Sequence, residues 1–210
     1  LEAPSAVVGA DDNVVLFAAV RPKDGALPSI VRAVSDRGGL SFGPIETVVE
    51  ASGLPVWAAA GAISPGVLFH DGAWLLAFAT EDGAAIGLAR SADGRSFEVE
   101  TEPLLRAAGE GAETGGIGSP SLARDGDSLL LAYEARAEAG APPDIRLARG
   151  GPTGDGLERL GVALAAGEGC TDVKGEDEPC WDSFGVSEPE LRSATTGAGR
   201  RVLRLFYTGH

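Results

Sequence analysis

Two carboxylate side chains stand beside prolines that open short apolar segments, and such carboxylates could serve as an acid and a base. Glu188 directly precedes Pro189, and Glu2 lies two residues before Pro4. Hydrolysis by a carboxyl pair requires one group to protonate the leaving oxygen while the other activates a water molecule. The elements that carry Glu2 and Glu188 would therefore have to hold the two groups at a fixed separation.

The segments that carry these residues are copies of a sequence motif that is repeated along the chain. Each copy has a Pro, a few further residues, a turn rich in Asp, Gly or Asn, and then an apolar run. A missing Pro N–H costs little at the start of a strand, and such turn residues favour a hairpin, so each copy predicts two antiparallel strands. The copies are EAPSAVVGADDNVVLFAAV from Glu2, ISPGVLFHDGAWLLAFAT from Ile63, GSPSLARDGDSLLLAYEA from Gly118 and SEPELRSATTGAGRRVLRLFYTG from Ser187.

Two further strands are predicted in each complete unit. SIVRAVS, AAIGLARS and DIRLARG are predicted third strands, and FGPIETVVE, FEVETEPLL and LERLGVALA are predicted fourth strands. No segment has a long apolar period of 3.6 residues, so we expect almost no helix. Four-stranded sheets repeated at roughly 40 to 60 residues are typical of a β-propeller, which we prefer to a β-sandwich. The predicted fold is all-β, a single β-propeller domain over residues 1–210 with units 1–62, 63–117, 118–186 and 187–210.

The composition limits the partners of the protein. The 210 residues carry a formal net charge of −14, and such an acidic surface repels phosphate backbones, so we expect no nucleic-acid partner. No run of about 18 apolar residues is present, so we expect no membrane span. Cys170 and Cys180 lie in a polar loop without a nearby His. We predict a local disulfide there and no metal site, with two free thiols as the alternative; a disulfide implies a secreted or periplasmic protein.

The clearest family resemblance lies in IGLARSADGRSFEVE, residues 86–100. Together with the repeated motif that begins at each proline, this stretch resembles the five-bladed β-propeller glycosidases. These comprise the arabinanase and β-xylosidase group, the invertase and levansucrase group, and the mannoside phosphorylases. The resemblance implies a five-bladed propeller that acts on or binds carbohydrate, and we predict no cofactor. The sequence supplies about three and a half blades. We therefore expect the remaining propeller strands to lie outside this sequence, in a longer parent chain or another copy.

A turn inside this stretch also resembles the Asp-box of sialidases. Ser91, Asp93, Gly94 and Phe97 have the residue types of that motif, with a spacing one residue short. An Asp-box turn caps a hairpin and packs an aromatic ring. We therefore predict a structural role for this turn and assign no chemistry to it.

The family resemblance also assigns roles to the residues before the prolines. In the resembled family, three carboxylates on the innermost strands converge on a central funnel: a base in Asp-Pro, an acid in Glu-x-Pro, and a third Asp that tunes the acid. By this pattern Glu2 would be the general acid. Glu188 would be the base, with Glu in place of Asp and in an order rotated relative to the family. The two middle units have Ser64 and Ser119 directly before their prolines.

Several interpretations of these residues stay open. In the first, Glu2 and Glu188 are catalytic and the third carboxylate lies on an unseen blade. In the second, Ser64 and Ser119 mark a degenerate catalytic set that binds a sugar or another polar ligand without cleaving it. In the third, both Glu side chains are merely solvated at strand starts. A hypothesis of another class is a non-catalytic propeller scaffold for protein–protein interaction.

Loops that lead into the inner strands add candidate ligand-binding residues. Trp57 precedes the second inner strand, and Trp181 and Asp182 precede the fourth. A flat aromatic ring there could stack on a sugar face while Asp182 accepts hydrogen bonds from hydroxyls; the alternative is that the Trp rings fill gaps between blades. His210 has no evident nucleophilic partner. The predicted ligand-binding residues are Trp57, Ser64, Ser119, Trp181 and Asp182.

Overall fold

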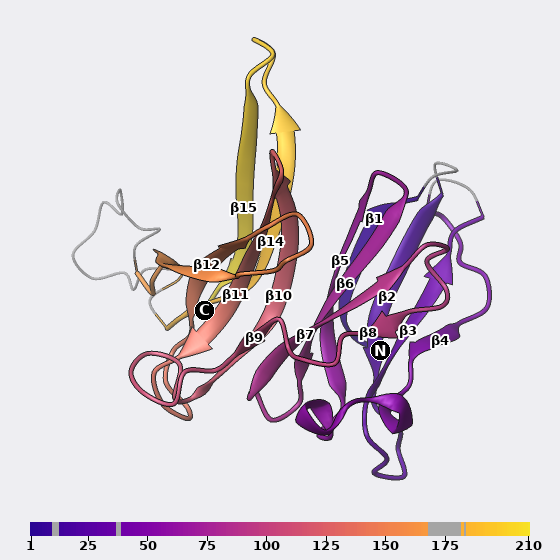
Figure 1. The fold of residues 1–210 in the computed structure, drawn as a ribbon, viewed down its shortest axis with the longest axis horizontal. Coiled ribbons are helices and arrows are strands. Elements are labelled where there is room, and N and C mark those ends of the chain that lie inside the picture. The colour runs from indigo at the N-terminus through magenta and orange to yellow at the C-terminus, as the bar shows by residue number, and fades with distance from the viewer. Residues whose placement is uncertain (10–12, 37–38, 168–181, 183) are drawn as a thin grey trace. The chain divides into compact units, whose positions relative to one another are not determined.

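The computed structural model describes residues 1–9, 13–36, 39–167, 182 and 184–210, and these form an all-β structure (Figure 1). The helices in these ranges are two single-turn 3-10 helices, η1 (Ala51–Gly53) and η2 (Val56–Ala58). The prediction of an all-β chain with almost no helix is confirmed. In the described ranges, no helix combines the length and hydropathy that crossing a membrane requires. Trp181 and the predicted disulfide between Cys170 and Cys180 lie outside the described residues.

The chain divides into two compact units, Leu1–Arg106 and Ala107–His210. Unit 1 has two sheets in meander order, β1-β2-β3-β4 and β5-β6-β7-β8, with β9 also paired to β7; unit 2 has the meander β10-β11-β12-β13 and the hairpin β14-β15. The predicted four-stranded antiparallel sheets are confirmed. The strands of unit 1 are β1 (Glu2–Val8), β2 (Val14–Val20), β3 (Ser29–Val34), β4 (Glu46–Val49), β5 (Ala62–His70), β6 (Ala73–Thr80), β7 (Ala85–Ser91), β8 (Glu98–Val99) and β9 (Leu105–Arg106). Those of unit 2 are β10 (Gly116–Asp125), β11 (Ser128–Arg136), β12 (Asp144–Gly150), β13 (Glu158–Leu164), β14 (Val186–Thr195) and β15 (Arg201–Gly209).

The apolar runs become second strands, each paired on both edges. β2, β6 and β11 lie between the first and third strands of their sheets. A strand that is paired on both edges and covered on both faces has no side for polar residues, so its sequence is nearly continuously apolar. Phe17, Leu76 and Leu131 are fully buried in these strands. The apolar runs therefore form the centre of each sheet.

The fourth strand of the second sheet differs from the expected continuous strand FEVETEPLL. The structure divides it into β8 and β9, both of which pair with β7. Pro103 lies between them and has no N–H to donate to a strand ladder. In the same interval the Thr101 carbonyl accepts a hydrogen bond from the indole of Trp57 at 2.9 Å. The segment between the two short strands therefore leaves the sheet.

A serine hydroxyl links neighbouring first strands within each unit. In unit 1 the Ser5 hydroxyl accepts a hydrogen bond from the Val67 N–H at 3.2 Å. In unit 2 the Ser121 hydroxyl accepts one from the Leu191 N–H at 2.9 Å. Both serines directly follow the proline of their repeat, and both bonds are buried. β1 therefore lies beside β5, and β10 beside β14, in the same relative register.

The turn that resembles an Asp-box is structural, as predicted. The Ser91 hydroxyl donates to the Asp93 carboxylate at 2.8 Å, and the Ser96 N–H donates to the same oxygen at 2.8 Å. Hydrogen bonds from the backbone N–H of Ser96 and of its neighbour hold the pKa of Asp93 far below its ordinary value. Phe97 packs edge to face against the buried Phe17, with ring centroids 5.8 Å apart. The carboxylate thus closes the turn, and the aromatic ring anchors it to the core.

Candidate functional site

The residue before each repeated proline has a left-handed backbone. The φ angles are 46° at Ala3, 48° at Ser64, 43° at Ser119 and 52° at Glu188. Among the described non-glycine residues, Asp71 in a hairpin turn is the one other with positive φ. This conformation is unfavourable for a residue with a Cβ, and such strain concentrates at functional sites. The repeated strain therefore identifies these positions as the candidate site.

A shift in strand pairing accompanies the left-handed residue in every repeat. The register of the first and second strands changes between Glu2 and Ser5, and likewise in the other three sheets. Each shift is a β-bulge, which turns a side chain out of the regular alternation. The four Pro-led segments are therefore first strands of their sheets that share one backbone geometry. The corresponding shifts lie at Ile63/Gly66, Gly118/Ser121 and Ser187/Glu190.

In unit 1 the bulges carry Ala3 and Ser64, and a charged cluster lies beside the first. The Glu2 side chain is 55% exposed, and its carboxylate lies 3.6 Å from the Arg21 guanidinium. Arg21 also donates a hydrogen bond to Glu81. Hydrogen bonding and charge attraction from Glu81 raise the pKa of Arg21 above its ordinary value. Glu2 is thus held on the surface by a guanidinium that two carboxylates share.

In unit 2 the bulge of β14 is held by a buried carboxylate. The N–H of Glu188 donates to Glu134 Oε1 at 2.8 Å, and the Glu134 side chain is 6% exposed. Arg136 pairs with the other Glu134 oxygen at 3.2 Å. The Thr208 hydroxyl donates to Glu188 Oε2 at 3.0 Å. Because its backbone and its carboxylate are both hydrogen-bonded, the exposed Glu188 is held in one orientation.

A contact between Ser187 and His210 joins the two ends of the same hairpin. The Ser187 hydroxyl and the His210 Nε2 lie 2.5 Å apart, and Ser187 is buried. The His210 N–H also donates to the Gly185 carbonyl at 3.0 Å. The sequence indicated no nucleophilic partner for His210, and the structure places the Ser187 hydroxyl beside its ring. Only the pairing register of β14 and β15 brings these two residues together, and no local motif indicates it.

Two of the predicted ligand-binding residues, Trp57 and Asp182, make contacts within their own units. Trp57 lies on η2, stacks on Phe78 with ring centroids 5.9 Å apart, and donates its indole N–H to Thr101. Gly87 lies under both rings, where a Cβ would overlap them. Asp182 is fully buried, and its carbonyl accepts a hydrogen bond from the Gly185 N–H at 3.2 Å. These contacts bind Trp57 and Asp182 to their own units.

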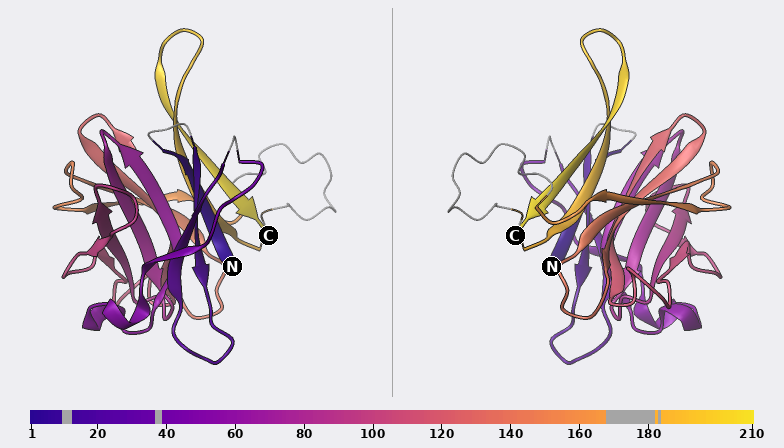
Figure 2. Two further views of the ribbon diagram at one scale, coloured as in Figure 1. Left: turned by 90° about the vertical axis from the view of Figure 1, so that its right-hand side faces the viewer. Right: turned by 90° about the vertical axis from the view of Figure 1, so that its left-hand side faces the viewer.

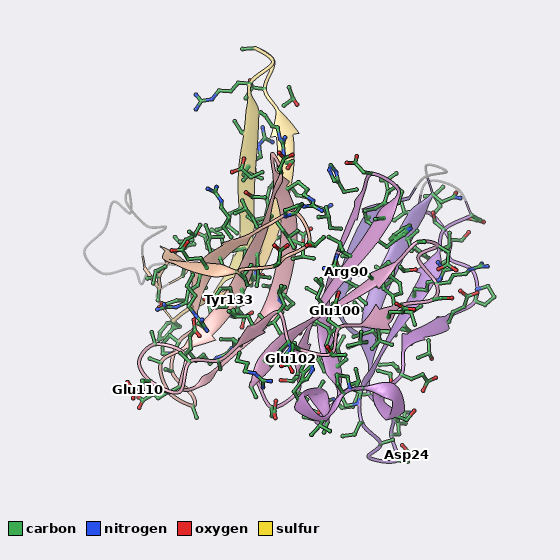
Figure 3. All side chains as sticks on the ribbon, viewed as in Figure 1. Asp24, Arg90, Glu100, Glu102, Glu110 and Tyr133 are labelled. Carbon is green, nitrogen blue, oxygen red and sulfur yellow. The ribbon has the colours of Figure 1, made fainter. Side chains whose placement is uncertain are left out.

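A buried carboxylate that the sequence did not single out lies in unit 2. Glu113, 3% exposed, accepts hydrogen bonds from the hydroxyl of the fully buried Tyr133 at 2.8 Å and from Arg159 at 2.7 Å (Figure 3 labels Tyr133). Burial opposes ionisation of Glu113, but the bonds from Arg159, the Ala108 N–H and Tyr133 outweigh it and lower its pKa. Burial, reinforced by Glu113, raises the pKa of Tyr133. This cluster fixes the loop before β10.

Other features of the described residues do not point to a second candidate site. No group of three His, Cys, Asp or Glu side chains is arranged there to hold a metal ion. Surface depressions of about 400 and about 650 Å³ in unit 1 both include Phe97 and neither is lined by Glu2 or Ser64. The larger one borders the structural turn at Asp93. The bulges of the first strands therefore stay the best candidate site.

Known structures resemble this chain, although no protein-family model and no curated protein matches it. A sucrose-6-phosphate hydrolase from Lactobacillus gasseri matches 98% of this chain at 14% identity with a TM-score of 0.71. A glycoside hydrolase family 43 protein from Bacillus licheniformis matches 98% of this chain at 14% identity with a TM-score of 0.59. A xylan β-1,4-xylosidase from Bacillus halodurans C-125 matches 70% of this chain at 18% identity with a TM-score of 0.57. The chain spans 40%, 36% and 30% of these proteins, respectively. By fold, the chain is therefore similar to the β-propeller glycoside hydrolases that its sequence resembles.

Proposed function

We propose that this chain is part of a five-bladed β-propeller of the glycoside hydrolase type, and that it binds or cleaves carbohydrate at the bulges before its repeated prolines. The observation that carries this proposal is the left-handed residue that recurs at Ala3, Ser64, Ser119 and Glu188. Strain of this kind, about 1–3 kcal/mol per residue, persists where the surroundings impose it, and it aims a side chain away from the regular strand alternation.

In the catalytic form of this proposal, Glu2 is the acid and Glu188 is the base. The acid would donate a proton to the leaving glycosidic oxygen, and the base would take a proton from the attacking water. The bond from Thr208 orients the Glu188 carboxylate for this role. In the binding form, Ser64 and Ser119 supply hydroxyls to the sugar in place of carboxylates, and no bond is broken.

The strands that would complete the fold belong to the same proposal. β15 pairs with β14 alone in the described part of the chain, whereas β2, β6 and β11 are each paired on both edges. An unpaired edge readily accepts another strand. We propose that strands from outside this sequence pair with β15, and that the protein is secreted or periplasmic with Cys170 and Cys180 bonded.

Titration with oligomers of arabinose, xylose and mannose, followed calorimetrically and by release of reducing sugar, tests the carbohydrate proposal. Glu188→Gln removes the charge at the bulge and should weaken binding about tenfold, or lower hydrolysis by about 10² or more if the set is catalytic. Glu158→Gln changes an exposed carboxylate on β13 and is the matched control. If no sugar binds and Glu188→Gln has no effect, the proposal fails.

A further inference from the structure

The carboxylate of Glu134 interrupts an otherwise apolar part of β11. The strand has the sequence SLLLAYEAR, and its seven central residues, Glu134 included, are buried. Glu134 is 5% exposed. Removing a carboxylate from water is costly, and a single ion pair does not always offset that cost. Packing within the strand therefore does not account for a carboxylate here, whereas a role in the candidate site does.

The fold does not require a carboxylate at this position. The second-strand residue opposite the second residue before proline is Ala19 in the first sheet, Ala79 in the second and Glu134 in the third. Glu134 bonds to the bulge of the sheet that follows its own. In unit 1 the corresponding bulge, at Ser64, has its positive φ with an alanine at the equivalent position. The bulges therefore form without a buried carboxylate.

Glu134 links the two bulges of unit 2. β14 lies beside β10 in this unit (Figures 1 and 2). The register places Glu134 opposite Gly118, which directly precedes Ser119 of the β10 bulge. The Glu134 Oε1 accepts the N–H of Glu188, on the β14 bulge, at 2.8 Å. These contacts lie within unit 2, and none of them involves the edge of β15.

Gly118 leaves a space on the same face of the sheet as Glu134. Residues directly opposite each other in an antiparallel pair have their side chains on one face. At the equivalent position of β5, Ile63 packs against the core of unit 1. Apart from the chain neighbours of Gly118, no described atom lies within 4 Å of the place that a Cβ would take there, so Glu134 does not fill the space. Gly118 is partly exposed, which gives a small group access from solvent.

The Glu134 carboxylate has acceptor capacity to spare. Its Oε1 holds the Glu188 N–H, and its Oε2 accepts a hydrogen bond from Arg136 at 3.2 Å. Within the described part of the chain, no other residue bonds to this carboxylate. An ionised carboxylate accepts about four hydrogen bonds, so about two remain for a donor such as a hydroxyl. A ligand carboxylate would be repelled by the like charge.

We propose that Glu134 and the space at Gly118 form a hydroxyl-binding subsite of the candidate site, and that this subsite selects a neutral sugar. The inference rests on the proposed carbohydrate function and specifies its ligand. A sugar hydroxyl enters the space at Gly118 and donates a hydrogen bond to Glu134. Ser119 and Glu188, on the two bulges that Glu134 links, belong to the same binding surface. Glu134 keeps its charge throughout, and no covalent bond changes at the subsite.

The first test fills the space. We titrate the protein calorimetrically with neutral oligomers of arabinose, xylose and mannose. Gly118→Ile introduces the residue that β5 has at the equivalent position, and it should weaken binding about tenfold or more because the hydroxyl is excluded. Gly197→Ile is the matched control, since Gly197 lies in the β14-β15 turn with no described atom within 4 Å of its Cβ position. It should change binding less than about twofold.

The second test separates ligand binding from a purely structural role of Glu134. Glu134→Gln keeps an acceptor oxygen but removes the charge, so it should weaken binding about tenfold. If both changes act on one hydroxyl, adding Glu134→Gln to Gly118→Ile should cause less than about a twofold further loss. A structural role would instead make the two losses add. Oligogalacturonate should bind at least about tenfold more weakly than the neutral oligomers, and Glu134→Gln should narrow this difference.

Each contrary outcome has a distinct meaning. If sugar binding depends on Glu188 and folded Gly118→Ile binds like the unchanged protein, the subsite is refuted and the carbohydrate function stands. If no sugar binds the unchanged protein, both proposals fall. Urea unfolding shows whether Gly118→Ile is folded. If it is not, Glu134→Gln decides, and an unchanged affinity for neutral sugars refutes the subsite.

Discussion

The left-handed backbone at Ser64 predicts that glycine gives a more stable fold than alanine at this position, although Ser64 lies inside strand β5. We compare Ser64→Gly with Ser64→Ala, since both remove the hydroxyl and only the alanine retains a Cβ. The control compares the unchanged protein, which has Ala73, with Ala73→Gly. Ala73 is an exposed residue of β6, and its φ is not positive. Both positions lie in the same sheet of unit 1.

The expected difference in the free energy of unfolding follows from two opposing effects. A Cβ in the left-handed region costs about 1–2 kcal/mol, which glycine avoids. Glycine loses more backbone entropy on folding, which costs about 0.5–1 kcal/mol. Ser64→Gly should therefore be more stable than Ser64→Ala by about 0.5–1 kcal/mol. Ala73→Gly should lose about 0.5–1 kcal/mol, because only the entropy effect acts there.

Urea unfolding followed by tryptophan fluorescence measures this difference. Two of the three tryptophans, Trp57 and Trp74, lie in unit 1, so we measure the emission in a Trp181→Phe background, where it reports on the part of the chain that contains Ser64. The sign reversal between the two sites is the diagnostic result. If glycine destabilises both positions equally, the left-handed conformation is not imposed by the fold and the argument for a strained site is wrong.

Two further predictions concern unit 2. Ser121→Ala leaves the buried Leu191 N–H without its acceptor and should lower the free energy of unfolding by about 1–3 kcal/mol in urea titrations, whereas Ser121→Thr, which keeps a hydroxyl, should lose less. Glu113 has a lowered pKa in the folded state, so its stabilisation is present above its ordinary pKa of 4.5 and is lost as the pH falls through the folded value. Stability measured from pH 6 down to about pH 3 should fall in that window. In Glu113→Gln the fall should be shallower, and an unchanged slope would show that Arg159 and Tyr133 do not depend on the carboxylate charge.

Local patterns determined the strands and turns. Apolar runs such as VVLFAAV and WLLAFAT alternate with turns of Asp and Gly, and these properties act over a few neighbouring residues. The repeated prolines marked the first strands because a strand start tolerates a missing N–H. Hence the sequence alone predicted the all-β class and the four-stranded meanders. It also predicted the structural role of the turn at Asp93, whose partners are its own neighbours.

The geometry of the candidate site was decided by tertiary structure. A residue before proline is locally biased towards an extended backbone, yet Ser64 and Glu188 have positive φ. The bond from the Glu188 N–H to Glu134 spans 54 residues, and the contact of Ser187 with His210 spans 23. Such bonds depend on which strands pair and in what register. A short stretch of sequence specifies neither the pairing nor the register. The sequence thus determined which elements form, and packing between strands decided which side chains meet.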